Sequence, residues 1–139
     1  MRQTKVLSHK DAMVIIDAVR SSLEARDAGA AVAVSDEHGE LIALLRTDGC
    51  PLASINNAIN KAYTAARERI PSGELGRRSR EDGFPMTNFA DLRYIGWGGG
   101  LPLETDGVIV GAVGVSGLPE AIDIEVATLG VEAWKATIG

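Results

Sequence analysis

The hydrophobic positions near the start of the chain follow the period of a helix. One face carries apolar side chains at three- and four-residue spacing: Ala12, Ile15, Ile16, Val19 and Leu23. Ser8, followed three residues later by Asp11, fits an N-cap with an acidic first turn, and Gly29 interrupts the pattern. These signals predict a helix over about residues 8–28.

Two short apolar runs then predict an antiparallel hairpin. The runs "AAVAVSD" and "LIALLRTD" are separated by "EHGE", where Gly39 supplies the turn glycine. A second helix is predicted from about Leu52 to Ile70, because its apolar positions are mostly alanines on one narrow face. Pro71 ends it by excluding helical geometry at the preceding residue. So many small residues indicate close contact with a sheet.

The second half of the chain is less regular. Residues 72–92 show weak periodicity, which predicts one helical turn and then a long irregular connection. Strands are predicted at residues 94–99 and 108–117, joined through residues 100–107. A last helix begins near Pro119, with four apolar residues expected to face inward: Ile122, Val126, Leu129 and Ala133. This order predicts an α+β domain over residues 1–139 with an antiparallel sheet.

Glycine is concentrated in one stretch. Residues 96–117 hold eight of the chain's sixteen glycines. The stretch lacks the Gly-Lys-Ser/Thr of a nucleotide loop, and a strand rather than a helix follows it. Gly107 in "TDG" is typical of a hairpin turn. The run of Gly98, Gly99 and Gly100 exceeds what one turn needs, which leaves two interpretations: a bulged strand, or backbone lying against a ligand or a neighbouring subunit.

The composition of the chain narrows the classes of molecule that the protein could bind. The formal charge of −5 argues against nucleic-acid binding, although Arg67, Arg69 and three arginines within residues 77–80 form a local basic cluster. The single cysteine, Cys50, cannot form an intrachain disulfide. Neither a secretory signal nor a membrane-spanning apolar stretch is evident, so we expect a cytoplasmic protein with no membrane partner.

Four long segments carry a family resemblance. They are "DEHGELIALLRTDGCPLASINNAINKAYTAA", "IPSGEL", "GGGLPLETDGVIVGAVGVSG" and "DIEVATLGVEA". Together they resemble the GlcG/HbpS family, also found as the C-terminal domain of PduO-type proteins, over about residues 8–135. The resemblance implies a profilin-like, three-layer α/β/α fold with a five-stranded antiparallel sheet flanked by helices. It also implies a homo-oligomer, between dimer and octamer. The chain departs from the family pattern at "ERIPSGEL" and at "FPMTNFADLRYIGW".

The resemblance further implies that the protein binds haem or a related tetrapyrrole in a pocket near a subunit interface. Haem needs an axial ligand such as His, Cys, Met or Tyr. His9, at the start of the first helix, is the first candidate; Cys50, Met86 and Tyr94 are others. Arg67 would meet the propionates, and the Gly98–Gly100 backbone would admit a flat ligand. His38, in the "EHGE" turn, is expected to be exposed, and no metal site is predicted.

The alternative to haem binding is that the protein is an enzyme. Lys61 lies beside the apolar face of the second helix, where a lysine either extends to water or faces a pocket. In a pocket it could hold a carboxylate or act as a base, and Arg93 could clamp the same acid. This hypothesis describes a cofactor-independent isomerase, tautomerase or hydrolase acting on a carboxylated catabolic intermediate. Asp123 is expected only to support the last helix by its first-turn charge. The third hypothesis is that the protein is a scaffold whose function is assembly.

Overall fold

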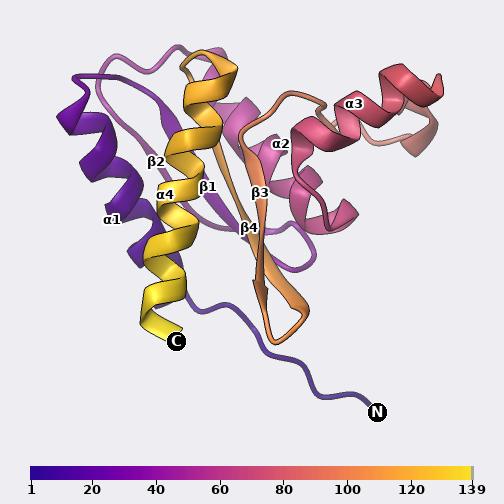
Figure 1. The fold of residues 1–139 in the computed structure, drawn as a ribbon, viewed down its shortest axis with the longest axis horizontal. Coiled ribbons are helices and arrows are strands. Elements are labelled where there is room, and N and C mark those ends of the chain that lie inside the picture. The colour runs from indigo at the N-terminus through magenta and orange to yellow at the C-terminus, as the bar shows by residue number, and fades with distance from the viewer. Residues whose placement is uncertain (139) are drawn as a thin grey trace.

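The strands form one antiparallel sheet in the order β2–β1–β4–β3 (Figure 1). The structure is a computed structural model and describes residues 1–138. The first hairpin joins β1 (Ala31–Asp36) to β2 (Leu41–Arg46), and the second joins β3 (Gly100–Thr105) to β4 (Val108–Ser116). β1 and β4 therefore lie side by side at the centre, although 71 residues separate Asp36, at the end of β1, from Val108, at the start of β4.

Helices cover both faces of this sheet. α1 (His9–Ala25) and α4 (Glu120–Ile138) pack together on one face, and α2 (Ala53–Glu68) lies alone on the other (Figure 1). α3 (Ser72–Asp82) and the short 3₁₀ helix η1 (Met86–Phe89) extend past the β3 edge. This arrangement confirms the α+β class and the helix layers on both sides of an antiparallel sheet.

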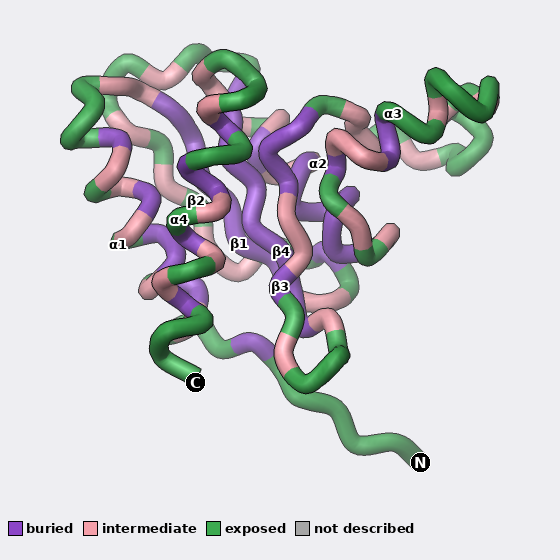
Figure 2. The backbone as a smooth tube through the Cα atoms, in the orientation of Figure 1, coloured by how far each residue is buried: buried purple, intermediate pink, exposed green. Residues whose placement is uncertain are grey.

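The core has two layers of different composition. Val32 and Val34 face α1 and α4, whose buried side chains include Ile15 and Trp134. The other face of the sheet meets α2 through alanines: Ala31, Ala33, Ala58, Ala62, Ala65, Ala66 and Ala112. Figure 2 shows burial concentrated on β1, β4 and the facing side of α2. Alanine side chains allow α2 to approach the sheet backbone closely, as its composition predicted.

Two predictions about the strands need correction. Four strands form the sheet within residues 1–138, not five. Residues 94–99 were predicted as a strand but form bends, and the strand begins at Gly100 inside the predicted connection. Its apolar alternation is weak because Pro102 and Gly100 interrupt it, so pairing with β4 decides the assignment. The first hairpin and its turn at Gly39 are as predicted.

The structure also differs from the prediction at α3, where only one turn of helix was predicted. The helix runs for 11 residues although few of its side chains are buried. Arg77 forms ion pairs with both Glu74 and Glu81, and Arg78 pairs with Glu74. Such pairs, one turn apart, stabilise an exposed helix without apolar periodicity.

In α4, Val126 is buried as expected, whereas Leu129 is exposed and Trp134 takes the core position.

None of the helices within residues 1–138 is long and apolar enough to cross a membrane.

The start of β3 depends on two glycines that lie against neighbouring backbone. A Cβ atom on Gly100 would lie 2.3 Å from the carbonyl oxygen of Lys61, on α2. A Cβ atom on Gly99 would lie 2.4 Å from the carbonyl oxygen of Val115, and Gly99 has a φ of +125°. Both contacts are shorter than van der Waals distance, so these positions exclude any side chain. Gly99 and Gly100 thus lie against the backbone of their own chain, which neither interpretation described, and the register shift of β3 comes later, between Leu103 and Glu104.

We expect Gly99→Ala to destabilise the protein by about 3 kcal/mol or more, because the methyl group must displace the β4 backbone as well as adopt a strained φ. Gly83→Ala is the matched control: its φ is +71°, but nothing lies within 4 Å of the added Cβ, so about 1 kcal/mol is expected. Urea unfolding followed by circular dichroism measures both. Equal losses for the two variants would contradict the steric argument.

Candidate functional site

A pocket of about 350 Å³ opens where α2, β4 and α4 meet. Its walls come from the first half of α2, the residues before β3, the end of β4 and the first turn of α4. The lining residues are Ser54, Asn57, Lys61, Trp97, Gly98, Ser116, Gly117, Leu118, Glu120 and Asp123. We call this the Lys61 pocket. Its volume lies at the lower end of the range for small-molecule sites.

Lys61 is buried beside the pocket rather than extended to water. Its side chain is 3% exposed, and Nζ donates hydrogen bonds to the Val115 carbonyl oxygen at 2.9 Å and to Asp123 Oδ2 at 3.1 Å. An ammonium group has three N–H donors, so these two bonds leave one N–H uncommitted. The structure therefore favours the alternative in which Lys61 faces a pocket over the one in which it extends to water.

Asp123 completes a buried ion pair. Its side chain is 4% exposed, and its Oδ1 accepts a hydrogen bond from the Leu118 backbone N–H at 3.0 Å. Burial raises the pKa of the Asp123 carboxyl, while the Lys61 ammonium opposes that rise. Asp123 was expected only to support α4. It lies in the first turn of that helix but also holds Lys61, which the sequence signal for a first-turn acid does not reveal.

The three consecutive glycines divide between two roles. Gly98 lines the Lys61 pocket, and a Cβ there would lie 2.7 Å from the Ile124 side chain. A Cβ on Gly99 would lie 3.0 Å from Lys61 Nζ and 3.2 Å from Asp123 Cβ, so glycine keeps the ion pair intact. Ser72 Oγ holds the segment by accepting from the Gly100 N–H at 2.9 Å and donating to the Trp97 carbonyl oxygen.

Arg67, Arg93 and Tyr94 gather around Tyr63, at a site that shares no residue with the Lys61 pocket. The guanidinium carbon of Arg93 lies 4.0 Å from the centroid of the Tyr63 ring, and that of Arg67 lies 5.0 Å away. The Tyr63 hydroxyl donates to Asp91, and Tyr94 meets Tyr63 edge to face. The structure therefore does not bring Lys61 and Arg93 together around one substrate.

Ionic contacts of this aromatic cluster secure the segment before β3. Arg93 pairs with Asp91, and this contact, then the Tyr63 hydroxyl, lowers the pKa of the Asp91 carboxyl. Burial, and then the bond to Asp91, raises the pKa of the Tyr63 hydroxyl. Asp91, Arg93 and Tyr94 thus hold Tyr63 and one another. Their observed role is to anchor residues 89–95 against α2.

The candidate haem ligands lie at separate places. His9 is exposed at the first residue of α1. Cys50 is half-buried before α2, and burial raises the pKa of its thiol. Met86 lies outside the Lys61 pocket, beside Trp97 in a neighbouring hollow of about 360 Å³. Tyr94 stacks on Phe89.

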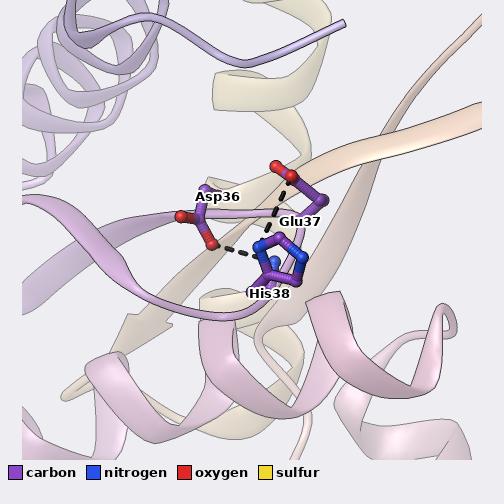
Figure 3. Close-up of side chains that lie close together, drawn as sticks. All are labelled: Asp36, Glu37 and His38. Atoms are coloured by element: carbon purple, nitrogen blue, oxygen red, sulfur yellow. Dashed lines mark hydrogen bonds and ion pairs between the residues drawn. The ribbon is translucent and has the colours of Figure 1, made fainter. Parts of the chain in front are cut away.

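His38 is exposed as predicted and lies with Asp36 and Glu37 in the first hairpin turn (Figure 3). The ligand atoms of these three side chains lie within 4.8 Å of one another. Asp36 Oδ1, however, already accepts hydrogen bonds from the backbone N–H groups of His38 and Glu40, at 2.8 and 3.0 Å. This carboxylate therefore serves the turn, as aspartate commonly does in hairpins.

Comparison with known proteins identifies the family. Residues 7–132 match the family described as "Haem degrading protein HbpS-like". The chain is 35% identical to Protein GlcG of Escherichia coli K12 over 122 residues, which cover 84% of this chain and 85% of that protein. The chain therefore belongs to the HbpS-like family.

Solved structures show the same fold. A double mutant of HbpS from Streptomyces reticuli is 28% identical and superposes with a TM-score of 0.86, covering 100% of this chain and 91% of its own. A PduOC:haem complex also superposes with a TM-score of 0.86, at 24% identity and with 93% and 95% of the two chains covered. At that identity the second likeness supports the fold alone.

The residues of the Lys61 pocket do not fit haem. None of its lining residues is a histidine, cysteine, methionine or tyrosine, the side chains that ligate haem iron. Its one cationic group, Lys61, is already paired with Asp123 and so is not free to meet a propionate.

Sequence reasoning identified Lys61 and Gly98 but missed Ser54, Trp97, Ser116 and Glu120. These four carry no motif, and only the folded chain brings them together.

We expect Lys61→Met to cost about 3–5 kcal/mol in free energy of unfolding near neutral pH, because it leaves the Asp123 carboxylate buried without a counter-ion. Without Lys61, only backbone hydrogen bonds oppose the effect of burial on this carboxyl, so its folded-state pKa rises further above 3.8. A raised pKa favours the folded state when the carboxyl is protonated, so the loss is smallest near pH 4 and grows as pH rises. Urea unfolding across this range measures it.

The double variant Lys61→Met/Asp123→Leu is the control, because it removes both charges and should recover much of the lost stability at neutral pH. A Lys61→Met deficit that stays constant with pH, or a double variant no more stable than the single one, would show that the pair is not a buried ionic interaction.

Proposed function

We propose that this protein binds a small polar molecule in the Lys61 pocket. The observation that carries this proposal is the set of uncommitted hydrogen-bonding groups above a buried ion pair. Within residues 1–138 no hydrogen bond occupies Ser54 Oγ, the Asn57 amide or Ser116 Oγ, and all three line the pocket. Polar side chains that converge on a concave site without partners of their own are typical of a ligand site.

The charges of the pocket indicate the ligand class. Lys61 and Asp123 offset each other, and the Glu120 carboxylate adds one further negative charge. A ligand with several carboxylates would meet this charge unfavourably. Hydroxyl and carbonyl groups suit the site better, because a carbonyl oxygen can accept the third Lys61 N–H and hydroxyls can bond Ser54, Asn57 and Ser116. The proposed ligand is therefore a small polyol, hydroxyaldehyde or hydroxy acid.

Asn57→Ala and Ser116→Ala should each weaken ligand binding about tenfold, since each removes a hydrogen bond without touching the ion pair. Isothermal titration calorimetry with polyols, hydroxyaldehydes and hydroxy acids of about three to six carbons provides the measurement. Ser21→Ala, on the exposed face of α1, is the matched control and should bind normally. Binding by the wild type that survives both pocket variants would place the ligand elsewhere, and no binding at millimolar concentration would refute the proposal.

The same titrations distinguish a binding protein from an enzyme. Lys61 and Asp123 could exchange a proton with a bound carbonyl compound, as an isomerase or tautomerase requires. Arg93 has no part in this version, because it pairs with Asp91 at the Tyr63 cluster. Each bound compound is recovered and checked by NMR: return of the unchanged compound supports binding alone, and an isomer supports the enzyme.

Haem binding is a second candidate function, supported by the family description "Haem degrading protein HbpS-like" and by the exposed imidazole of His9. Since haem does not fit the Lys61 pocket, this candidate places it on the surface at the start of α1. One face of haem would remain open there, so a second subunit would have to cover it. This version therefore requires the homo-oligomer that the family resemblance implies.

A haem titration followed in the Soret region tests this candidate, with light scattering on the same sample. We expect His9→Ala to abolish a saturable Soret shift that the wild type shows, because it removes the axial ligand. His38→Ala removes the other exposed histidine and is the matched control, with no expected effect. A wild type without a saturable shift, or a His9→Ala variant that binds as tightly, would rule out this site.

A further inference from the structure

A second cavity lies at the opposite end of the sheet from the Lys61 pocket. It has a volume of about 220 Å³ and lies between the N-terminal segment, the β3–β4 turn and the last turns of α4. The lining residues are Lys5, Val6, Leu7, Asp11, Thr105, Asp106, Val110, Trp134 and Ile138. No residue is shared with the Lys61 pocket. We call it the Trp134 cavity.

The indole of Trp134 has a buried donor without a partner. Trp134 is 2% exposed, and within residues 1–138 its Nε1–H forms no hydrogen bond. An unsatisfied buried donor costs about 1–3 kcal/mol, so native proteins rarely keep one without an occupant to accept the bond. The tryptophan lines the cavity, which is where such an occupant would lie.

Asp11 presents an acceptor to the same cavity. Its Oδ2 accepts the Ser8 N–H at 3.0 Å and the Ser8 Oγ–H at 2.7 Å, which completes the capping box of α1. No group within the described part of the chain donates to Oδ1. Ser8 chiefly lowers the pKa of the Asp11 carboxyl, and hydrogen bonding from the Trp134 indole contributes a smaller lowering. The indole N–H and the carboxylate therefore lie close together, although the N–H does not reach hydrogen-bond geometry.

The remaining wall combines four apolar residues with three polar ones: Val6, Leu7, Val110 and Ile138 with Lys5, Thr105 and Asp106. Leu7 is 5% exposed and Val110 is 2% exposed, and both pack in the core beside Trp134. At the rim, Lys5 Nζ lies 2.5 Å from Asp106 Oδ2, which ties the N-terminal segment to the β3–β4 turn. The cavity thus offers one donor, one acceptor and apolar side chains that a short alkyl chain can contact.

We propose that the Trp134 cavity binds a small aliphatic alcohol. A hydroxyl group is both acceptor and donor, so it can accept the Trp134 Nε1–H and donate to Asp11 Oδ1 at once. The alkyl chain lies against Leu7 and Val110, where burial of each CH₂ group favours binding. A ketone satisfies only the indole, and an ammonium group satisfies only the carboxylate. Water satisfies both polar groups but leaves the apolar wall without contacts, and it is the competing occupant.

The indole N–H resonance of Trp134 gives a direct test. The chain has two tryptophans, and Trp97→Phe assigns their two ¹H–¹⁵N indole signals. With 1-butanol as the probe, we expect the Trp134 signal to shift and saturate, because the hydroxyl becomes the acceptor of the indole N–H. The Trp97 indole, on a residue that is 61% exposed and lines the Lys61 pocket, reports any binding of the alcohol there and should not shift in proportion to the Trp134 signal.

Two variants locate the site. Trp134→Phe keeps an aromatic ring but lacks the donor, so affinity followed at the Val110 backbone amide should fall about tenfold. Val110→Ile leaves the donor in place but fills space, and it should reduce binding several-fold if Trp134→Phe proves too unstable to titrate. A Trp134 signal that does not move, or that moves in proportion to the Trp97 signal, would overturn the proposal and leave water as the occupant.

Discussion

The buried ion pair between Lys61 and Asp123 is the interaction on which the proposed site depends. It joins α2, on one face of the sheet, to the first turn of α4, on the other, through the ends of β3 and β4. A charge can lie in such a place only if it is paired and hydrogen-bonded, and here the Val115 carbonyl and the Leu118 N–H complete the bonding. Because both charges are satisfied internally, the pocket is polar without being strongly cationic.

The pair is possible because small residues let the backbone segments approach one another. Alanines bring α2 against the sheet, and glycine at positions 99 and 100 brings the start of β3 against Lys61 and Val115. A side chain at Gly99 would meet the Val115 carbonyl and the Lys61 ammonium together. The glycine-rich stretch therefore forms the wall of a polar pocket. Its sequence lacks the Gly-Lys-Ser/Thr of a nucleotide loop and contains no histidine, cysteine, methionine or tyrosine.

Membership of the HbpS-like family and the chemistry of the pocket point to different ligands. The family description names haem, whereas the Lys61 pocket has hydroxyl, amide and carboxylate groups and no residue that ligates iron. The two are compatible if haem binds at the surface near His9 and a smaller molecule binds inside. The Trp134 cavity adds a third location, at the far end of the sheet, with an orphan indole donor.

The sequence by itself determined the elements whose side chains repeat at a regular period: α1, the first hairpin, α2 and the antiparallel α+β class. It did not determine α3, because exposed ion pairs rather than buried apolar residues stabilise that helix. The pattern also misplaced β3, whose pairing with β4 outweighs its proline and glycine. Lys61 could be proposed from its position beside an apolar face. Its partner Asp123, 62 residues away, could not, because only tertiary packing decides which two buried charges meet.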